Sequence, residues 1–114
     1  MNEGDVVLTP LPQADGRVRN RPAVALRELP PYGDLLVCGV STQVHQLVSG
    51  FDELIIRSDA DFSTSGLLAD SVIRLGFLAV LPRKSILGSI GAISPHRHRR
   101  LLHRLSAYLV EKVR

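Results

Sequence analysis

Short apolar runs separated by turn residues dominate the first part of the chain. DVVLTPL, RPAVALREL and LLVCGVST occupy residues 5–11, 21–29 and 35–42. An Asp-Gly pair at 15–16 and the sequence PPYGD at 30–34 lie between these runs. Turn residues between apolar runs predict three strands that pair in sequence order as a meander.

Two further runs predict additional strands. ELIIRS, residues 53–58, predicts one, and SVIRLGFLAVL, residues 71–81, is rich in valine, isoleucine and leucine and predicts the central strand of the sheet. The polar stretch SDADFSTSGLLADS at 58–71 predicts a long loop between them.

The pattern becomes helical from Ser94 onward. Ser94 can cap a helix, and Pro95 suits the first helical position. Apolar residues then recur at spacings of mostly three and four: Leu101, Leu102, Leu105, Tyr108, Leu109 and Val113. The chain is therefore expected to form a single domain over residues 1–114, mainly β with a C-terminal helix packed on a small, strongly bent sheet or barrel.

Composition narrows the class of protein. A hydrophobic content of 45% with 22% charged residues predicts a folded chain rather than a disordered one. The net charge of +3 gives a modest attraction for anions. Cys38 is the single cysteine, which excludes an internal disulfide and a CxxC metal site. The N-terminus carries acids where a secretory signal needs bases, and no apolar run approaches the roughly 20 residues of a membrane span, so a cytoplasmic location is expected.

Arginines gather before the second predicted strand. Arg21 directly precedes Pro22, which disfavours helical geometry at Arg21 and stiffens the backbone at the predicted mouth of the strand. A guanidinium held in this way suits a phosphate, or the charge that builds on a phosphate during transfer. The alternative is a surface arginine at the start of a strand.

Hydroxyl groups end the third predicted strand. Strand alternation puts Ser41 on the same face as Gly39, where a missing side chain leaves room for a ligand. The alternative interpretation of Ser41 is a turn residue that bonds its own backbone.

Arg74 is the only charged residue within residues 71–81. Because an unpaired buried charge is costly, this arginine needs a partner or a solvent-filled cleft. An ion pair with Asp34 or Asp70 is the structural alternative to a ligand-binding role.

The basic segment HRHRR, residues 96–100, falls in the first turn of the predicted helix, where positive charge opposes the helix dipole. It is either a solvated basic face or a surface that meets a partner. Two histidines at this spacing diverge on a helix, so no metal site is expected. Phosphate-loop, HExxH and GxSxG signatures are absent, and five aromatic residues are too few for a base-stacking platform.

Taken in order, the motifs GDVVLTPLPQADGRVRNRPAVAL, LLVCGVST, SVIRLGFLAVL and SILGSIGAIS resemble the MazF/PemK family of toxin endoribonucleases over nearly the whole chain. The resemblance implies an SH3-like barrel with a C-terminal helix that forms a homodimer. It also implies cleavage of single-stranded RNA, such as mRNA, at short sequences, without a metal or other cofactor, and a cognate antitoxin that covers the active groove.

By position in the family motifs, the resemblance implies catalytic roles for Arg21 and Ser41, the latter standing where many members have threonine. Arg74 matches a strand arginine that some members use. Arg17 and Arg19 fall in a loop that closes over RNA, and Thr42, the second hydroxyl at the strand end, joins the expected RNA-binding set.

Two departures from the family pattern matter. Serine at position 41 keeps the hydroxyl and its hydrogen bond to a phosphate oxygen. Gly76 stands where some members have an aspartate that acts as the base, so activity here would depend on arginine and a hydroxyl. A barrel that has lost catalysis and binds RNA or a protein is the second hypothesis, and DNA binding through the helix arginines is the third.

Overall fold

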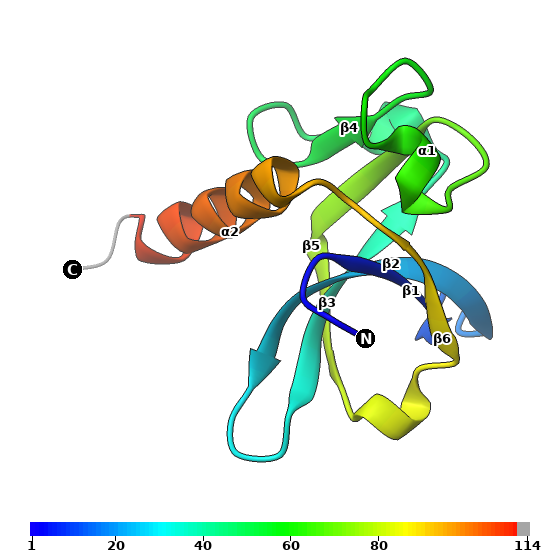
Figure 1. The fold of residues 1–114 in the computed structure, drawn as a ribbon, viewed down its shortest axis with the longest axis vertical. Helices are drawn as coiled ribbons and strands as arrows, with labels where there is room; N and C mark the ends of the chain where they lie inside the picture. Colours follow the sequence, from blue (N-terminus) through cyan, green and yellow to red (C-terminus); the bar gives the residue numbers. More distant parts are fainter. Residues whose placement is uncertain (112–114) are drawn as a thin grey trace.

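The computed structural model describes residues 1–111 and consists of one six-stranded antiparallel sheet, strongly curled into a half-barrel, with a C-terminal helix (Figure 1). The strand order is β4-β5-β3-β2-β1-β6. The elements are β1 Asp5–Pro12, β2 Val18–Leu29, β3 Asp34–Ser41, η1 Val44–Gln46, β4 Glu53–Ile55, α1 Phe62–Ser65, β5 Ser71–Leu81, η2 Arg83–Ser85, β6 Gly88–Ala92 and α2 Pro95–Val110.

The centre of the sheet is formed by β2 and β3, and both of its faces are covered. On one face Val24 and Cys38 pack in a cluster with Leu101 of α2. On the other face Ala23 and Val37 belong to a second cluster. Burial on both sides explains why these strands read as continuous apolar runs instead of alternating ones. Burial also raises the pKa of Cys38 to about 12, which keeps its thiol protonated and unreactive.

The fold class and the N-terminal meander β1–β2–β3 were predicted correctly, and several details were not. The strand predicted at 53–58 is the shorter β4, Glu53–Ile55. β5 has the predicted bounds but is not central: it lies next to the short edge strand β4, which pairs only with residues 71–73, and Leu78 and Val80 are exposed. β6 was missed, since its glycine-rich sequence contains only one strand-forming residue, Ile90. The loop at 58–71 contains the short helix α1.

The start of β2 was also predicted too late. Pairing with β1 extends to Pro12 opposite Val18, and a tight turn between them uses Gly16 at a φ of +81°. Arg21 therefore lies inside β2, opposite Thr9, instead of at the mouth of the strand. Polar residues form strand here because this end of the hairpin projects into solvent.

Helix α2 begins as predicted. The Ser94 side chain accepts a hydrogen bond from the backbone N–H of Arg97, and Pro95 occupies the first turn. Leu101 and Leu105 are buried against the sheet, whereas Tyr108 and Leu109 are exposed where the helix runs outward (Figure 1). Val113 lies outside the described residues. No helix within residues 1–111 is long and apolar enough to cross a membrane.

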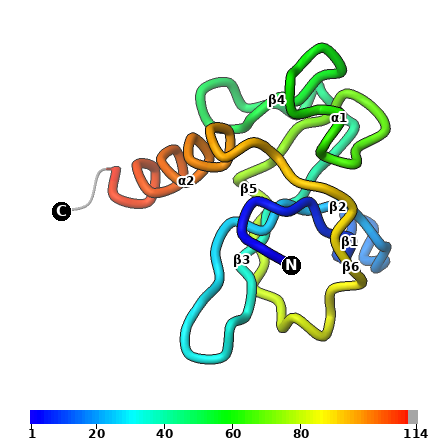
Figure 2. The backbone as a smooth tube through the Cα atoms, in the orientation of Figure 1, coloured from blue at the N-terminus to red at the C-terminus, as the bar shows by residue number. Residues whose placement is uncertain are grey.

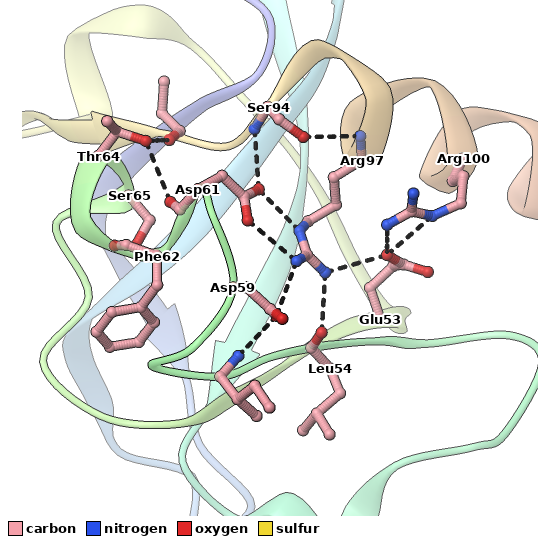
Figure 3. A network of polar contacts seen from close by, with 12 residues as sticks. Glu53, Leu54, Asp59, Asp61, Phe62, Thr64, Ser65, Ser94, Arg97 and Arg100 are labelled. Atoms are coloured by element: carbon pink, nitrogen blue, oxygen red, sulfur yellow. Dashed lines mark hydrogen bonds and ion pairs between the residues drawn. The ribbon is translucent and has the colours of Figure 1, made fainter.

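A buried ion-pair network fastens α2 to β4 and to the segment before α1 (Figure 3). The guanidinium of Arg97 donates to Asp61 at 2.8 Å and 3.0 Å, to Asp59 at 3.0 Å and to Glu53 at 3.1 Å. Glu53 also accepts from Arg100 at 2.7 Å, and its second oxygen lies near Arg104. The chain trace shows β4 and the start of α2 lying next to one another at this point (Figure 2). Because the buried members Arg97, Glu53 and Asp61 each have at least two polar partners, the cost of burying their charges is offset.

The network predicts a specific acid sensitivity. Hydrogen bonding and charge attraction from Arg97 lower the pKa of Asp61 from 3.8 to about 2. The stabilisation from ionised Asp61 is therefore complete above pH 3.8 and is lost as the pH falls through 2. Between pH 5 and pH 2 the wild type should lose about 2 kcal/mol more unfolding free energy than Asp61→Asn, measured by urea denaturation.

Asp34→Asn is the control, because Asp34 forms no ion pair within residues 1–111, and this variant should keep the pH dependence of the wild type. An Asp61→Asn variant as acid-sensitive as the wild type would contradict the assignment.

Candidate anion-binding site

The structure brings three of the predicted site residues together in one cavity. Arg21, Ser41 and Arg74 all line an open cavity of about 400 Å³, although they come from three different strands. Gly39 and Phe77 form part of its wall, and residues of the β1–β2 turn and of η1 complete it. Arg21 and Arg74 are half-buried and Ser41 is buried. Two arginines and a serine therefore line one cavity.

Strand register explains why these side chains meet. Ala23, Gly39 and Arg74 form a row of direct partners across β2, β3 and β5. Direct partners in antiparallel strands project from the same face of the sheet. Arg21 and Ser41 lie two positions along from Ala23 and Gly39, so strand alternation puts them on that face as well.

An irregularity in β5 shapes the wall of the cavity. Cys38 pairs with Leu78, but the next residue, Gly39, pairs with Arg74, so residues 75–77 of β5 have no counterpart on β3. Extra residues of this kind bend a strand and redirect its side chains. Here Phe77 lies over Gly39, and a β-carbon at Gly39 would be 3.2 Å from the Phe77 ring. The absence of a side chain at position 39 therefore makes room for the ring.

The turn interpretation of Ser41 is confirmed, and ligand binding by Ser41 stays a prediction. Its Oγ accepts a hydrogen bond of 3.0 Å from the backbone N–H of Gln43, as expected of a turn serine. The same side chain lines the cavity. Because the bond from Gln43 uses the oxygen as an acceptor, the hydroxyl hydrogen can still be donated to a ligand.

Arg74 forms no structural ion pair with the residues that the structure describes. Within residues 1–111 no ion pair joins Arg74 or Arg21 to a carboxylate, and the suggested partner Asp70 instead accepts from the backbone N–H of Arg57. The predicted pair of Arg74 with Asp34 or Asp70 is therefore absent from this part of the chain. No acidic residue lines the cavity, so the site is suited to an anion.

The remaining predicted binding residues lie outside this cavity. Thr42 is exposed and lines a neighbouring, mainly apolar cavity. Arg17 and Arg19 are exposed near the tip of the β1–β2 hairpin and line neither cavity, and Arg19 lies 3.9 Å from Asp15. A surface position of this kind leaves both guanidinium groups accessible to solvent.

Three glutamines in the cavity lining were not identified from the sequence: Gln13, Gln43 and Gln46. The Gln13 amide nitrogen donates to the carbonyl oxygens of Leu11 and Pro12, which leaves its amide oxygen free to accept. The only signal in the sequence was the position of Gln43 directly after the hydroxyl pair that ends β3. An amide supplies both hydrogen-bond donors and acceptors, whereas binding a phosphate requires donors only.

The predicted basic face at residues 96–100 is largely structural. Arg97 is buried among three carboxylates, and Arg100 pairs with Glu53. His98 lies 2.8 Å from the carbonyl oxygen of Leu26. Periodicity could not identify these partners, because they come from segments far away in the sequence. The positive charges of Arg97 and Arg100 are therefore largely neutralised within the fold.

Comparisons with known proteins identify no family. Neither a scan against protein-family models nor a search of curated proteins found a match to this chain. The MazF/PemK resemblance therefore depends on the sequence motifs alone.

The packing of Gly39 against Phe77 can be tested with two glycine variants. Gly39→Ala should lower the unfolding free energy by about 1 to 3 kcal/mol, because the new methyl group forces the Phe77 ring to move. Gly76→Ala is the matched control, since a β-carbon there meets nothing within 4 Å, and it should be neutral or stabilising by up to about 1 kcal/mol. Urea denaturation compares the two, and equal stabilities would contradict the described packing.

Proposed function

We propose that this protein is an endoribonuclease of the MazF/PemK type that cleaves single-stranded RNA through attack by the RNA's own 2′-hydroxyl. The observation that carries the proposal is the convergence of Arg21, Ser41 and Arg74 on one open cavity without an acidic lining residue. A dianionic phosphorane is the species that such a cavity stabilises best, because positive charge and a hydroxyl donor surround it.

In the proposed reaction the 2′-oxygen bonds to the adjacent phosphorus and the bond from phosphorus to the 5′-oxygen breaks. The 2′-hydroxyl loses its proton and the departing 5′-oxygen gains one, which leaves a 2′,3′-cyclic phosphate and a free 5′-hydroxyl. Arg21 and Arg74 stabilise the negative charge on phosphorus oxygens, and the Ser41 hydroxyl donates to a non-bridging oxygen. The nucleophile belongs to the substrate, so the protein contributes alignment and charge stabilisation.

The second candidate function is a catalytically inactive barrel that binds RNA or a protein. The observation in its favour is the set of residues that line the cavity, which contains no carboxylate, imidazole or lysine. These are the usual general bases, and a guanidinium is a poor one. Gly76, where some family members have an aspartate, is exposed and does not line the cavity.

A cognate antitoxin and a second copy of the chain are the partners that the resemblance implies. The exposed apolar side chains of Tyr108 and Leu109 on α2 support association with another protein, because burying them would be favourable.

Replacing Arg21 tests the enzymatic proposal. With a long single-stranded RNA and a chelator present, Arg21→Ala should cleave about 100-fold to 1,000-fold more slowly than the wild type, since one stabilising donor is lost. Arg99→Ala is the matched control, because Arg99 is exposed and lines no described cavity, and it should retain full activity. Gel analysis of the products measures the rates. Equal cleavage by wild type and Arg21→Ala would show that the site is wrong or that another nuclease is present.

Blocking the nucleophile distinguishes cleavage by the 2′-hydroxyl from hydrolysis by water. An oligonucleotide cleaved by the wild type should bind but remain intact when the nucleotide at the cut site carries a 2′-deoxyribose, and mass spectrometry should find cyclic phosphate ends only on the unmodified RNA. Cleavage of the deoxy-substituted strand would refute the mechanism. Binding of unmodified RNA without cleavage would favour the second candidate function.

A further inference from the structure

A second cavity adjoins the anion-binding site and differs from it chemically. It measures about 280 Å³ and is lined mainly by apolar side chains, among them Leu67, Leu68 and Ile90. Arg21 and Val40 line both cavities. Arg21 therefore lies at the boundary between the anion-binding cavity and an apolar cavity.

The end of β3 separates the two cavities. Ser41 lines the anion-binding cavity and Thr42, the next residue, lines the apolar one. Thr42 lies just beyond β3, so two hydroxyl-bearing residues that are adjacent in the sequence line different cavities. A ligand that crosses this point can contact both cavities.

The loop that forms the apolar wall is held in place by hydrogen bonds. The backbone N–H of Leu67 donates to the Ser65 hydroxyl at 3.1 Å, the Leu68 carbonyl accepts from Arg57 at 3.1 Å, and the Ala69 carbonyl accepts from the Ser71 hydroxyl at 2.8 Å. These contacts leave the Leu68 side chain 89% exposed. A fixed loop that exposes leucine beside a cavity loses little conformational freedom when it binds a ligand.

We infer that this apolar cavity binds the base of a nucleotide next to the phosphate held at Arg21. The inference rests on the proposed function and adds a base subsite to it. A fitting ligand carries a negative group directly beside a compact, largely apolar body, and a nucleotide has this combination. The volume lies just below the usual range for small-molecule sites, which suits one base better than an extended chain. The Thr42 hydroxyl can bond an edge of that base.

The test uses two decamers in which the nucleophile is blocked or absent: a random-sequence 2′-O-methyl RNA and an abasic sugar–phosphate of equal charge. Fluorescence anisotropy at constant salt should give an affinity about tenfold higher for the base-bearing decamer, since only this ligand buries the apolar wall. Methyl NMR should show shifts of the Leu68 and Ile90 signals with the base-bearing decamer and not with the abasic one.

Leu68→Ser should remove most of this difference. Leu87→Ser is the matched control, because Leu87 is also exposed and lines neither cavity, and it should bind like the wild type. Equal affinities of the wild type for both decamers would overturn the base subsite while leaving the phosphate site intact. Failure of both decamers to bind would contradict the proposed function itself. A Leu68→Ser variant that keeps the full preference for bases would assign recognition to another surface.

Discussion

The alignment of β2, β3 and β5 is the constraint on which the candidate site depends. One row of partners, Ala23, Gly39 and Arg74, sets the face of the sheet for Arg21 and Ser41. A slip of one residue in either pairing would turn the slipped strand's side chains to the opposite face. The apolar clusters on both faces oppose such a slip, because side chains that are buried in one cluster would move to the other face of the sheet. The core that stabilises the protein therefore also positions two arginines and a hydroxyl around one cavity.

The second organising feature is the separation of charges. Glu53, Asp59 and Asp61 all contact Arg97, and Glu53 also contacts Arg100 and Arg104. The acids of this segment thus neutralise helix arginines at one place in the fold, while Arg21 and Arg74 have no carboxylate partner within residues 1–111. The net charge of +3 does not show this distribution, in which two arginines without an ion pair within residues 1–111 line one cavity. The arrangement of charges therefore favours an anion at the cavity over one at the paired residues of α2.

Local patterns in the sequence predicted most of the fold and part of the site. The turns at Gly16 and residues 30–34, the cap at Ser94 and the bounds of β5 follow from short-range chemistry, and the structure agrees with them. The irregular pairing at Gly39, the entry of Gln46 into the cavity and the network around Arg97 depend on contacts between distant segments, which periodicity does not encode. The apolar cavity was missed for the same reason, since its lining comes from five separate parts of the chain.

The central claim is that a phosphate of RNA sits between Arg21 and Ser41. The most direct measurement is a crystal structure of the protein with a 2′-O-methyl oligonucleotide, which retains the phosphates but blocks the attack. One phosphate is expected to have its oxygens within hydrogen-bond distance of the Arg21 guanidinium and of the Ser41 hydroxyl, with Arg74 directed at the same group. An oligonucleotide bound along the exposed face of α2 or the hairpin tip, with no phosphate in the cavity, would contradict it.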